Sequence, residues 1–280
     1  MIIGARKGRR KRHKRKRLRL LRFRSLPQSK QMQFIRPCTK RRRKDYGQYI
    51  SEVINLIYIT GDTHIPVDIG KLSSKRFPEQ KQLTAEDFVI ICGDFGGVWD
   101  GKNEELYYRK WLDGKNFTTL FVDGNHENFD MLEELPTVEF CGGKAHKIGE
   151  KIYHLMRGEV YELCGKKIFT FGGGKSHDRE GRTEGKTWWQ REMPSHEEME
   201  HARQSLEKCA NSVDIIITHC APTSIQRMVM PQYENDVLTD FLEELKNKIS
   251  YEKWFFGHYH VDGAVDERCV AMFDKVIELP

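Results

Sequence analysis

Long apolar runs and paired cysteines are both missing from this chain of 280 residues. No apolar run approaches the roughly 20 residues that a membrane-spanning helix needs, so we expect a soluble protein that makes no membrane contact. The seven cysteines are scattered, odd in number and without a Cys-x-x-Cys pair, which argues against a disulfide framework or a zinc–thiolate site and favours the reducing cytoplasm. They are Cys38, Cys92, Cys141, Cys164, Cys209, Cys220 and Cys269.

Acidic residues are absent from the first 44 positions, which carry 20 Lys and Arg, whereas the remainder holds 27 basic and 41 acidic residues. A very basic arm, residues 1–50, therefore precedes an acidic body. Like charges this dense repel one another, so we expect the arm to be disordered until a polyanion binds, and it is too polar for a secretory signal. It is interpreted as a nucleic-acid tether, as a tail without a specific role, or as sequence upstream of a true start such as Met32.

The body, residues 51–280, alternates short apolar runs with longer amphipathic stretches, which indicates an α/β domain. The predicted main strands are Val53–Thr60, Phe88–Cys92, Thr118–Val122, Val213–Thr218 and Lys253–Phe256. Three further runs predict an antiparallel meander at Lys151–Leu155, Glu159–Cys164 and Lys167–Phe171. A capping-box pattern at Ser195 predicts a helix over Ser195–Ala210. An apolar stripe of helical spacing predicts a second over Val237–Leu245, and a terminal glycine predicts a third over Lys102–Asp113.

Each of the five main strands is followed by Asp, His or Asn, usually beside a glycine. The segments are Gly61-Asp62-Thr63-His64, Gly93-Asp94, Asp123-Gly124-Asn125-His126-Glu127, His219 and Gly257-His258-Tyr259-His260. In an open α/β sheet, functional residues gather beyond the carboxyl ends of the strands, so we expect these side chains to meet in one crevice. The glycines allow tight turns and a close approach of backbone to metal or phosphate.

The side chains in these segments predict a metal site. Carboxylate oxygen and imidazole nitrogen suit Mn²⁺, Fe, Zn²⁺, Co²⁺ or Ni²⁺ better than Mg²⁺ alone. Any one Asp or His here is more often a turn residue or a core group than a ligand, but five such segments in order are hard to obtain by chance. Seven candidates are too many for one tetrahedral ion and indicate two divalent ions, Mn²⁺ first among them, that share a carboxylate.

Together these segments resemble the motifs of the calcineurin-like metallophosphoesterase superfamily, from about Asn55 to His260. The resemblance implies a four-layer α/β/β/α sandwich, in which two mixed β-sheets pack face to face and helices lie outside. It implies a ligand set of Asp62, His64 and His260 for the first metal, Asn125, His219 and His258 for the second, and Asp94 bridging both. By the same resemblance, His126 is a catalytic residue over the leaving-group oxygen rather than a ligand.

The implied reaction is the hydrolysis of a phosphate ester by a metal-dependent phosphoric ester hydrolase. A hydroxide that bridges the two cations would attack phosphorus in line with the departing oxygen, because bound metal lowers the pKa of water by many units. A protonated His126 would then donate to that oxygen, and such general acid help raises rates by roughly 10²–10⁴. Glu127 is expected either to support the site from behind the ligands or to be a solvated turn residue.

One departure from the superfamily's protein Ser/Thr phosphatases bears on the substrate. Those enzymes extend the second motif as Gly-Asp-x-x-Asp-Arg-Gly, whereas Gly97 and Val98 occupy the Asp and Arg positions here. A phosphate-clamping arginine is therefore missing, which argues against a phosphoprotein phosphatase. The chain looks more like small bacterial and phage members.

A loop after Phe171 combines glycines, basic groups and the Trp188-Trp189 pair. We expect His177 or Arg182 to contact the substrate, and the alternative is a surface loop that the tryptophans anchor to the core. The remaining histidines match no site pattern and are interpreted as surface or helix residues. They are His13, His146, His154, His196 and His201.

Three functions fit this sequence. The first is a phosphoesterase acting on a phosphomonoester or a phosphodiester. The second is a nuclease or nucleic-acid end-processing enzyme, which the basic arm favours and the acidic body does not. The third is a non-catalytic metal-binding scaffold, which the intact set of seven ligands argues against.

Overall fold

The strands of the body form two mixed sheets, and a computed structural model describes residues 55–279. In this part of the chain seven strands form sheet A, in the order β13 (Val276–Glu278), β1 (Ile57–Thr60), β2 (Phe88–Ile91), β3 (Thr118–Phe121), β6 (Ile152–Leu155), β5 (Gly143–Lys147) and β4 (Thr137–Phe140). Six strands form sheet B, in the order β11 (Gly263–Ala264), β12 (Cys269–Ala271), β10 (Lys253–Phe256), β9 (Ile215–Thr218), β8 (Lys166–Phe171) and β7 (Val160–Leu163). The central strands of each sheet are parallel, and antiparallel pairs occur toward the edges.

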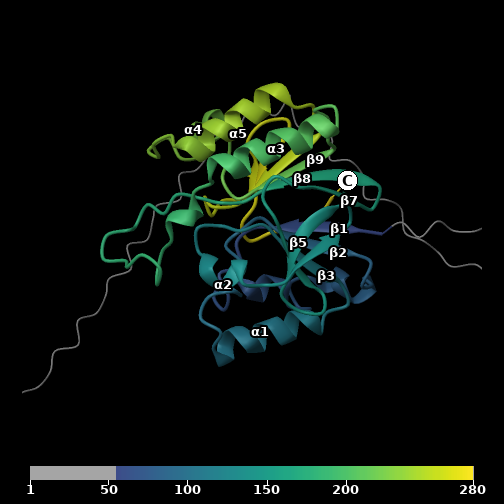
Figure 1. The fold of residues 1–280 in the computed structure, drawn as a ribbon. Coiled ribbons are helices and arrows are strands. Elements are labelled where there is room, and N and C mark those ends of the chain that lie inside the picture. The colour runs from purple at the N-terminus through teal and green to yellow at the C-terminus, as the bar shows by residue number, and fades with distance from the viewer. Residues whose placement is uncertain (1–54, 280) are drawn as a thin grey trace, which may run out of the picture. The chain divides into compact units, whose positions relative to one another are not determined.

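Central strands of both sheets are apolar on both faces, because each face is covered. In β1, Ile57 and Ile59 lie in the core between the sheets, whereas Tyr58 packs into the core outside sheet A. In β9, Ile215 and Ile217 lie between the sheets, whereas Ile216 packs into the core outside sheet B. Three apolar cores therefore separate four layers, and the predicted four-layer α/β/β/α sandwich is confirmed (Figure 1).

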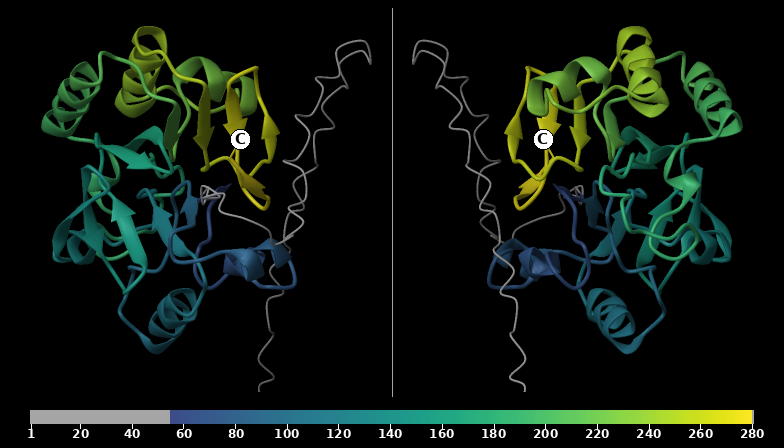
Figure 2. Two further views of the ribbon diagram at one scale, coloured as in Figure 1. Left: turned by 90° about the vertical axis from the view of Figure 1, so that its right-hand side faces the viewer. Right: turned by 90° about the vertical axis from the view of Figure 1, so that its left-hand side faces the viewer.

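Helices lie outside both sheets, as Figures 1 and 2 show. On the side of sheet A are α1 (Asn103–Asp113) and α2 (Phe129–Glu133), and on the side of sheet B are α3 (His196–Lys208), α4 (Thr223–Val229) and α5 (Val237–Lys248). Short 3₁₀ turns are η2 (Ile69–Leu72), η3 (Pro78–Gln82) and η4 (Gln190–Glu192). The capping box at Ser195 is confirmed, because its hydroxyl accepts from the Glu198 backbone N–H at 3.1 Å. No helix within the described residues has the length and apolar character needed to cross a bilayer.

The predicted three-stranded meander is wrong in one of its strands. Strands β7 and β8 do pair antiparallel, but β6 lies in sheet A and runs parallel to β3. The chain crosses between the sheets at Gly158, whose positive φ of 79° and close approach to Ala202 of α3 leave little room for a side chain. Local alternation identifies a strand, but not the sheet that the strand joins.

The interpretation of His146 and His154 as surface residues is also wrong. They lie on β5 and β6 with only 6% and 4% of their area exposed. Their Nδ1 atoms are 3.1 Å apart, and His154 Nε2 lies 3.1 Å from Asp123 Oδ1. Arg157 donates to the other oxygen of Asp123 at 2.9 and 2.6 Å. A buried polar network therefore satisfies these histidines beneath the end of β3.

This burial predicts a stability that depends on pH. Burial, then the charge of His154, lowers the pKa of His146 from its usual 6.5 to about 4, although the Asp123 charge acts in the opposite direction. The unfolded chain therefore binds a proton at His146 more readily than the folded one. The contribution of His146 to the free energy of unfolding is fully present above pH 6.5 and is lost as the pH drops toward 4, by at most roughly 3 kcal/mol. Urea unfolding of His146→Leu between pH 7 and pH 4 should show a shallower fall, whereas His196→Leu on the exposed start of α3 should match the unsubstituted protein. Equal slopes for all three proteins would contradict this cause.

Candidate metal centre

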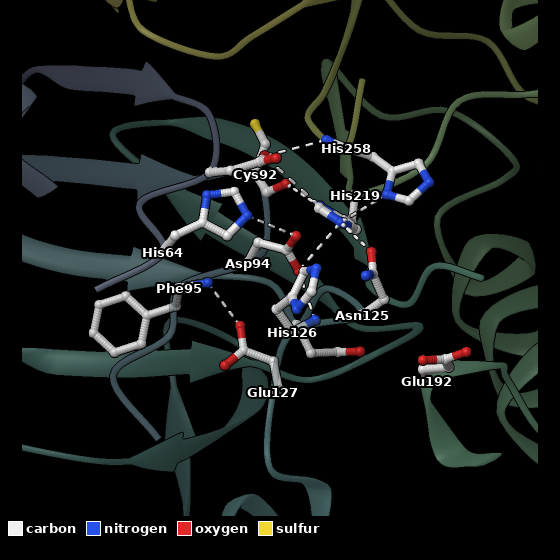
Figure 3. Close-up of polar contacts among 12 residues, drawn as sticks. His64, Cys92, Asp94, Phe95, Asn125, His126, Glu127, Glu192, His219 and His258 are labelled. Carbon is white, nitrogen blue, oxygen red and sulfur yellow. Dashed lines mark hydrogen bonds and ion pairs between the residues drawn. The ribbon is translucent and has the colours of Figure 1, made fainter. Parts of the chain in front are cut away.

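Loops at the carboxyl ends of strands from both sheets carry the seven predicted ligands. In sheet A, Asp62 and His64 follow β1, Asp94 follows β2, and Asn125 follows β3. In sheet B, His219 follows β9, and His258 and His260 follow β10. Figure 3 shows five of these seven side chains turned toward one another, His64, Asp94, Asn125, His219 and His258. Residues separated by up to 198 positions in the sequence are thus brought to one place.

Asp94 lies at the centre of this cluster and is almost fully buried. Its Oδ2 is 3.1 Å from His64 Nε2, and its Oδ1 is 3.4 Å from His219 Nε2. Beyond His64, His260 Nε2 lies 3.1 Å from Asp62 Oδ2. Oxygen and nitrogen atoms of Asp62, His64 and His260 all lie within 4.8 Å of one another, as do those of Asp62, Asp94 and His219.

The other side of the cluster is built around His219, which is fully buried. Its Nε2 lies 3.2 Å from Asn125 Oδ1 and 3.3 Å from His258 Nδ1 (Figure 3). The opposite ring nitrogen, Nδ1, lies 2.8 Å from the carbonyl oxygen of Cys92, which can only accept, so Nδ1 carries the proton. In the neutral ring, Nε2 then directs a lone pair at the amide oxygen of Asn125, and a cation between them would satisfy both.

Two observations test whether the residues fit such ions. Asp62 and Asp94 are buried carboxylates in one cluster, and burying like charges together is costly unless positive charge compensates them. Within the described part of the chain, Asp62 Oδ2 is buried and makes no hydrogen bond, although His260 Nε2 lies 3.1 Å from it. Lone pairs of oxygen and nitrogen thus converge from both sheets, and this donor set fits two divalent cations that share Asp94.

Histidines supply the protein's own positive charge here. Burial on its own raises the pKa of Asp94, but the charge and hydrogen bond of His219 outweigh it and hold that pKa well below its usual range. Burial lowers the pKa of His219, and the Asp94 charge more than reverses this, so the pKa rises to about 10. His64 behaves alike, with a pKa of about 9. Protons and metal ions therefore compete for the same ring nitrogens.

Four of the seven predicted ligands have an unusual backbone conformation with positive φ. Non-glycine residues rarely adopt positive φ, yet His64, Asp94, His258 and His260 have φ of 34°, 46°, 66° and 51°. Such strain costs about 1–3 kcal/mol per residue and collects at functional sites. At Gly93 the reason for glycine is direct, because φ is 94° and a Cβ would stand 2.1 Å from His219 Nδ1.

Comparison with known proteins agrees with this geometry. Residues 56–262 match the calcineurin-like phosphoesterases. The chain belongs to the calcineurin-like phosphoesterase family. That confirms the family predicted from the motifs and its class, a metal-dependent phosphoester hydrolase.

Among characterised proteins, lariat debranching enzymes are similar to this family member. The chain is 27% identical over 222 residues to lariat debranching enzyme A of Xenopus laevis, which covers 66% of the chain and 39% of that protein. Identity to lariat debranching enzyme of Homo sapiens is 27% over 208 residues, covering 62% and 36%. For Schizosaccharomyces pombe it is 27% over 187 residues, covering 60% and 36%. The chain thus spans less than two fifths of the length of these relatives.

His126 of this phosphoesterase lies at the rim of the cluster. Its backbone N–H donates to Asp94 Oδ1 at 2.8 Å, and its ring stands edge-on to the His64 ring with centroids 5.6 Å apart. Burial lowers the pKa of His126, partly offset by the Asp94 charge. A ring nitrogen of His126 lies within 4.8 Å of donor atoms of His64 and Asp94, so both a proton donor and a further ligand are geometrically available roles.

Glu127 is not a solvated turn residue, because it is completely buried. Its Oε1 accepts from the Phe95 backbone N–H at 2.7 Å and so braces the loop that carries Asp94 (Figure 3). Burial, then the charge of Asp94, raises its pKa well above the usual range. The expectation of a supporting position behind the ligands therefore describes Glu127 better.

Two supporting groups are found only in the structure. Asp68 Oδ2 lies 2.9 Å from His64 Nδ1 and orients that ring. The buried Lys71 ammonium donates to the carbonyl oxygens of Asp62 at 2.6 Å and Gly61 at 3.3 Å, so it fixes the turn after β1. In the sequence, both resemble ordinary surface charges, and no motif marks them.

The loop after β8 has one anchor and one approach to the site. Trp189 is buried, packs edge-on against Trp99 and donates to Asp130 at 2.8 Å, so it holds the loop to the core. His177 packs against Tyr233 with the rings tilted and their centroids 3.8 Å apart, and its ring lies 5.9 Å from that of His258.

Arg182 lies further along the same loop. Its guanidinium pairs with Asp178 at 2.7 Å, and its charge is among those that lower the pKa of His126. The structure thus brings His177 beside the cluster and Arg182 within electrostatic reach of it. Substrate contact by either residue stays a prediction.

Proposed function

We propose that this chain is a dinuclear metal-dependent phosphoesterase that hydrolyses a phosphodiester. The observation that supports it most is the convergence of carboxylate, imidazole and amide donors on Asp94 from the strand ends of two sheets. One cation would be held by Asp62, His64 and His260, the other by Asn125, His219 and His258, and Asp94 would be shared. Mn²⁺ is the proposed ion, because these are nitrogen and oxygen donors without thiolate.

The residues would divide the work of the reaction. When bound, the two cations would supply a lowered pKa for coordinated water and neutralise charge on the phosphoryl oxygens. Asp94 would link the two ligand sets. The Cys92 carbonyl oxygen orients His219, and Asp68 orients His64, so that the Nε2 lone pair of each ring faces the centre. As a general acid, His126 would donate a ring proton to the departing oxygen.

A diester is proposed over a monoester because the site offers few fixed positive side chains. A monoester carries one more negative charge than a diester and needs more compensation. Val98, where phosphoprotein phosphatases of the family have an arginine, is a buried core residue. Arg182, whose charge helps to lower the pKa of His126, is already paired with Asp178.

A nucleic-acid diester is the second candidate, and two observations favour it. The similar relatives are named for debranching lariats. The basic arm, which lies outside the described residues, suits a polyanion through counterion release. We accordingly propose a tether in residues 1–50, a catalytic domain in residues 51–280 and, from six free cysteines among the described residues, a cytoplasmic location.

A substrate panel with Mn²⁺ tests the proposal. Bis-p-nitrophenyl phosphate should be hydrolysed faster than p-nitrophenyl phosphate, and single-stranded RNA and DNA would reveal nuclease activity. A reversed order of the two small esters would overturn the diester. No turnover of any of them, with two ions bound, would favour the scaffold.

Removing residues 1–44 should separate the tether from the catalytic domain. The truncated protein should keep its turnover of bis-p-nitrophenyl phosphate, because no predicted site residue lies in the arm. Its affinity for RNA or DNA should fall and lose most of its dependence on salt, since binding through many basic residues weakens steeply as salt rises. Fluorescence anisotropy with labelled oligonucleotides at several salt concentrations measures this, and an unchanged salt slope would contradict the tether.

A further inference from the structure

A buried serine and glutamate lie directly behind Asn125, and no motif marks them. Ser176 belongs to the loop after β8 and Glu192 to η4, and both side chains are buried. The carboxylate of Glu192 accepts twice from Ser176, from the backbone N–H at 3.0 Å and from the hydroxyl at 2.8 Å. Its charge is compensated by the Arg179 guanidinium, which stacks over the Trp188 ring.

The direction of each hydrogen bond in this chain of groups is determined. A carboxylate can only accept, so the single hydroxyl proton of Ser176 is committed to Glu192. Ser176 Oγ can then only accept, and it does so from Asn125 Nδ2 at 3.3 Å. The NH₂ end of the Asn125 amide is thereby fixed toward Ser176, which leaves Oδ1 toward His219 Nε2 at 3.2 Å.

This ordering matters because the two ends of an asparagine amide have nearly the same shape. Reversed, the amide would direct two N–H donors at the ligand cluster and could not bind a cation. Figure 3 shows Glu192 on the side of Asn125 that faces away from His219. The loop is held in place separately, since Gly174 N–H donates to the Glu192 carbonyl oxygen at 3.0 Å.

We propose that Ser176 and Glu192 are positioning residues that orient the Asn125 amide oxygen toward the second cation of the centre. The proposal rests on the proposed dinuclear site. It makes the loop after β8 part of the metal centre, and it assigns Glu192 a reason to be a buried charge. A purely structural role for the pair, which only packs the loop, is the competing explanation.

Calorimetric titration of the metal-free full chain with Mn²⁺ tests this proposal. The unsubstituted protein should bind two ions. Ser176→Ala should lower the affinity for one ion by roughly 10- to 100-fold, the usual effect of losing a partner that orients a ligand. The affinity for the other ion should stay unchanged. Ser176→Thr keeps the hydroxyl and should restore the affinity for that ion. Lys186→Ala, an exposed change in the same loop, should bind as the unsubstituted protein does.

The outcomes separate the two proposals. Fewer than two ions on the unsubstituted protein would overturn the dinuclear site itself. If Ser176→Ala bound both ions with the same affinities as the unsubstituted protein, only the positioning role would be overturned. Equal weakening of both ions by Ser176→Ala, or no recovery in a folded Ser176→Thr, would also overturn it, because packing of the loop has no reason to favour one ion.

Discussion

Asp94→Asn is expected to lower the affinity for both metal ions and to reduce turnover of a phosphodiester by roughly a thousandfold or more. The carboxylate lies between His64 Nε2 at 3.1 Å and His219 Nε2 at 3.4 Å, so its two oxygens face the two halves of the cluster. Asparagine keeps the shape but removes the charge and turns one oxygen into an N–H donor. Losing metal-derived charge stabilisation of several kcal/mol corresponds to that fall in rate.

Metal content by mass spectrometry and Mn²⁺ titration by calorimetry measure the effect at each position. Asp100→Asn, the same change at an exposed aspartate on the same stretch of chain, should leave both quantities unchanged. If Asp94→Asn retained one ion at its original affinity, Asp94 would belong to a single metal rather than bridge two. Circular dichroism should show that the variant is folded, so that loss of metal is not loss of structure.

The position of the site could be predicted from the sequence, because strand ends are local features. Runs such as Phe88–Cys92 and Thr118–Val122 mark buried parallel strands, and whatever follows them must emerge at one edge of a sheet. The amino-acid order alone therefore places Asp94 and Asn125 in one crevice. The three helices with clear caps or stripes are equally predictable, since a capping box is a contact between residues three apart.

Contacts across the fold leave no such trace in the sequence. The sheet that β6 joins depends on its partner β3, which lies 31 or more residues earlier, and the local pattern is that of any short strand. Burial of His146 and His154 depends on Asp123, which lies 3.1 Å from His154 Nε2 and whose charge Arg157 compensates. Lys71 and Glu192 carry charges that normally indicate surface, and only tertiary hydrogen bonds explain why they are inside.

His126→Ala is expected to retain both metal ions and to lower turnover by roughly 10²–10⁴, the range of general acid catalysis. Its ring stands at the rim of the cluster beside His64, and its fixed contact with Asp94 is made by the backbone N–H rather than the ring. Alanine keeps that backbone contact, so Asp94 should stay in place. Loss of a metal together with activity would make His126 a ligand instead.

Substrates whose leaving groups differ in basicity test whether His126 supplies the proton to the departing oxygen. A p-nitrophenolate departs readily without one, whereas the alkoxide of a nucleoside diester needs it. His126→Ala should therefore slow hydrolysis of a dinucleotide far more than that of bis-p-nitrophenyl phosphate, with the metal content of both reactions the same. His177→Ala, a change at a ring that lies 5.9 Å from that of His258, should affect the two substrates without regard to leaving-group basicity. Equal losses on both substrates for His126→Ala would mean that the histidine orients the phosphate and does not protonate the departing oxygen.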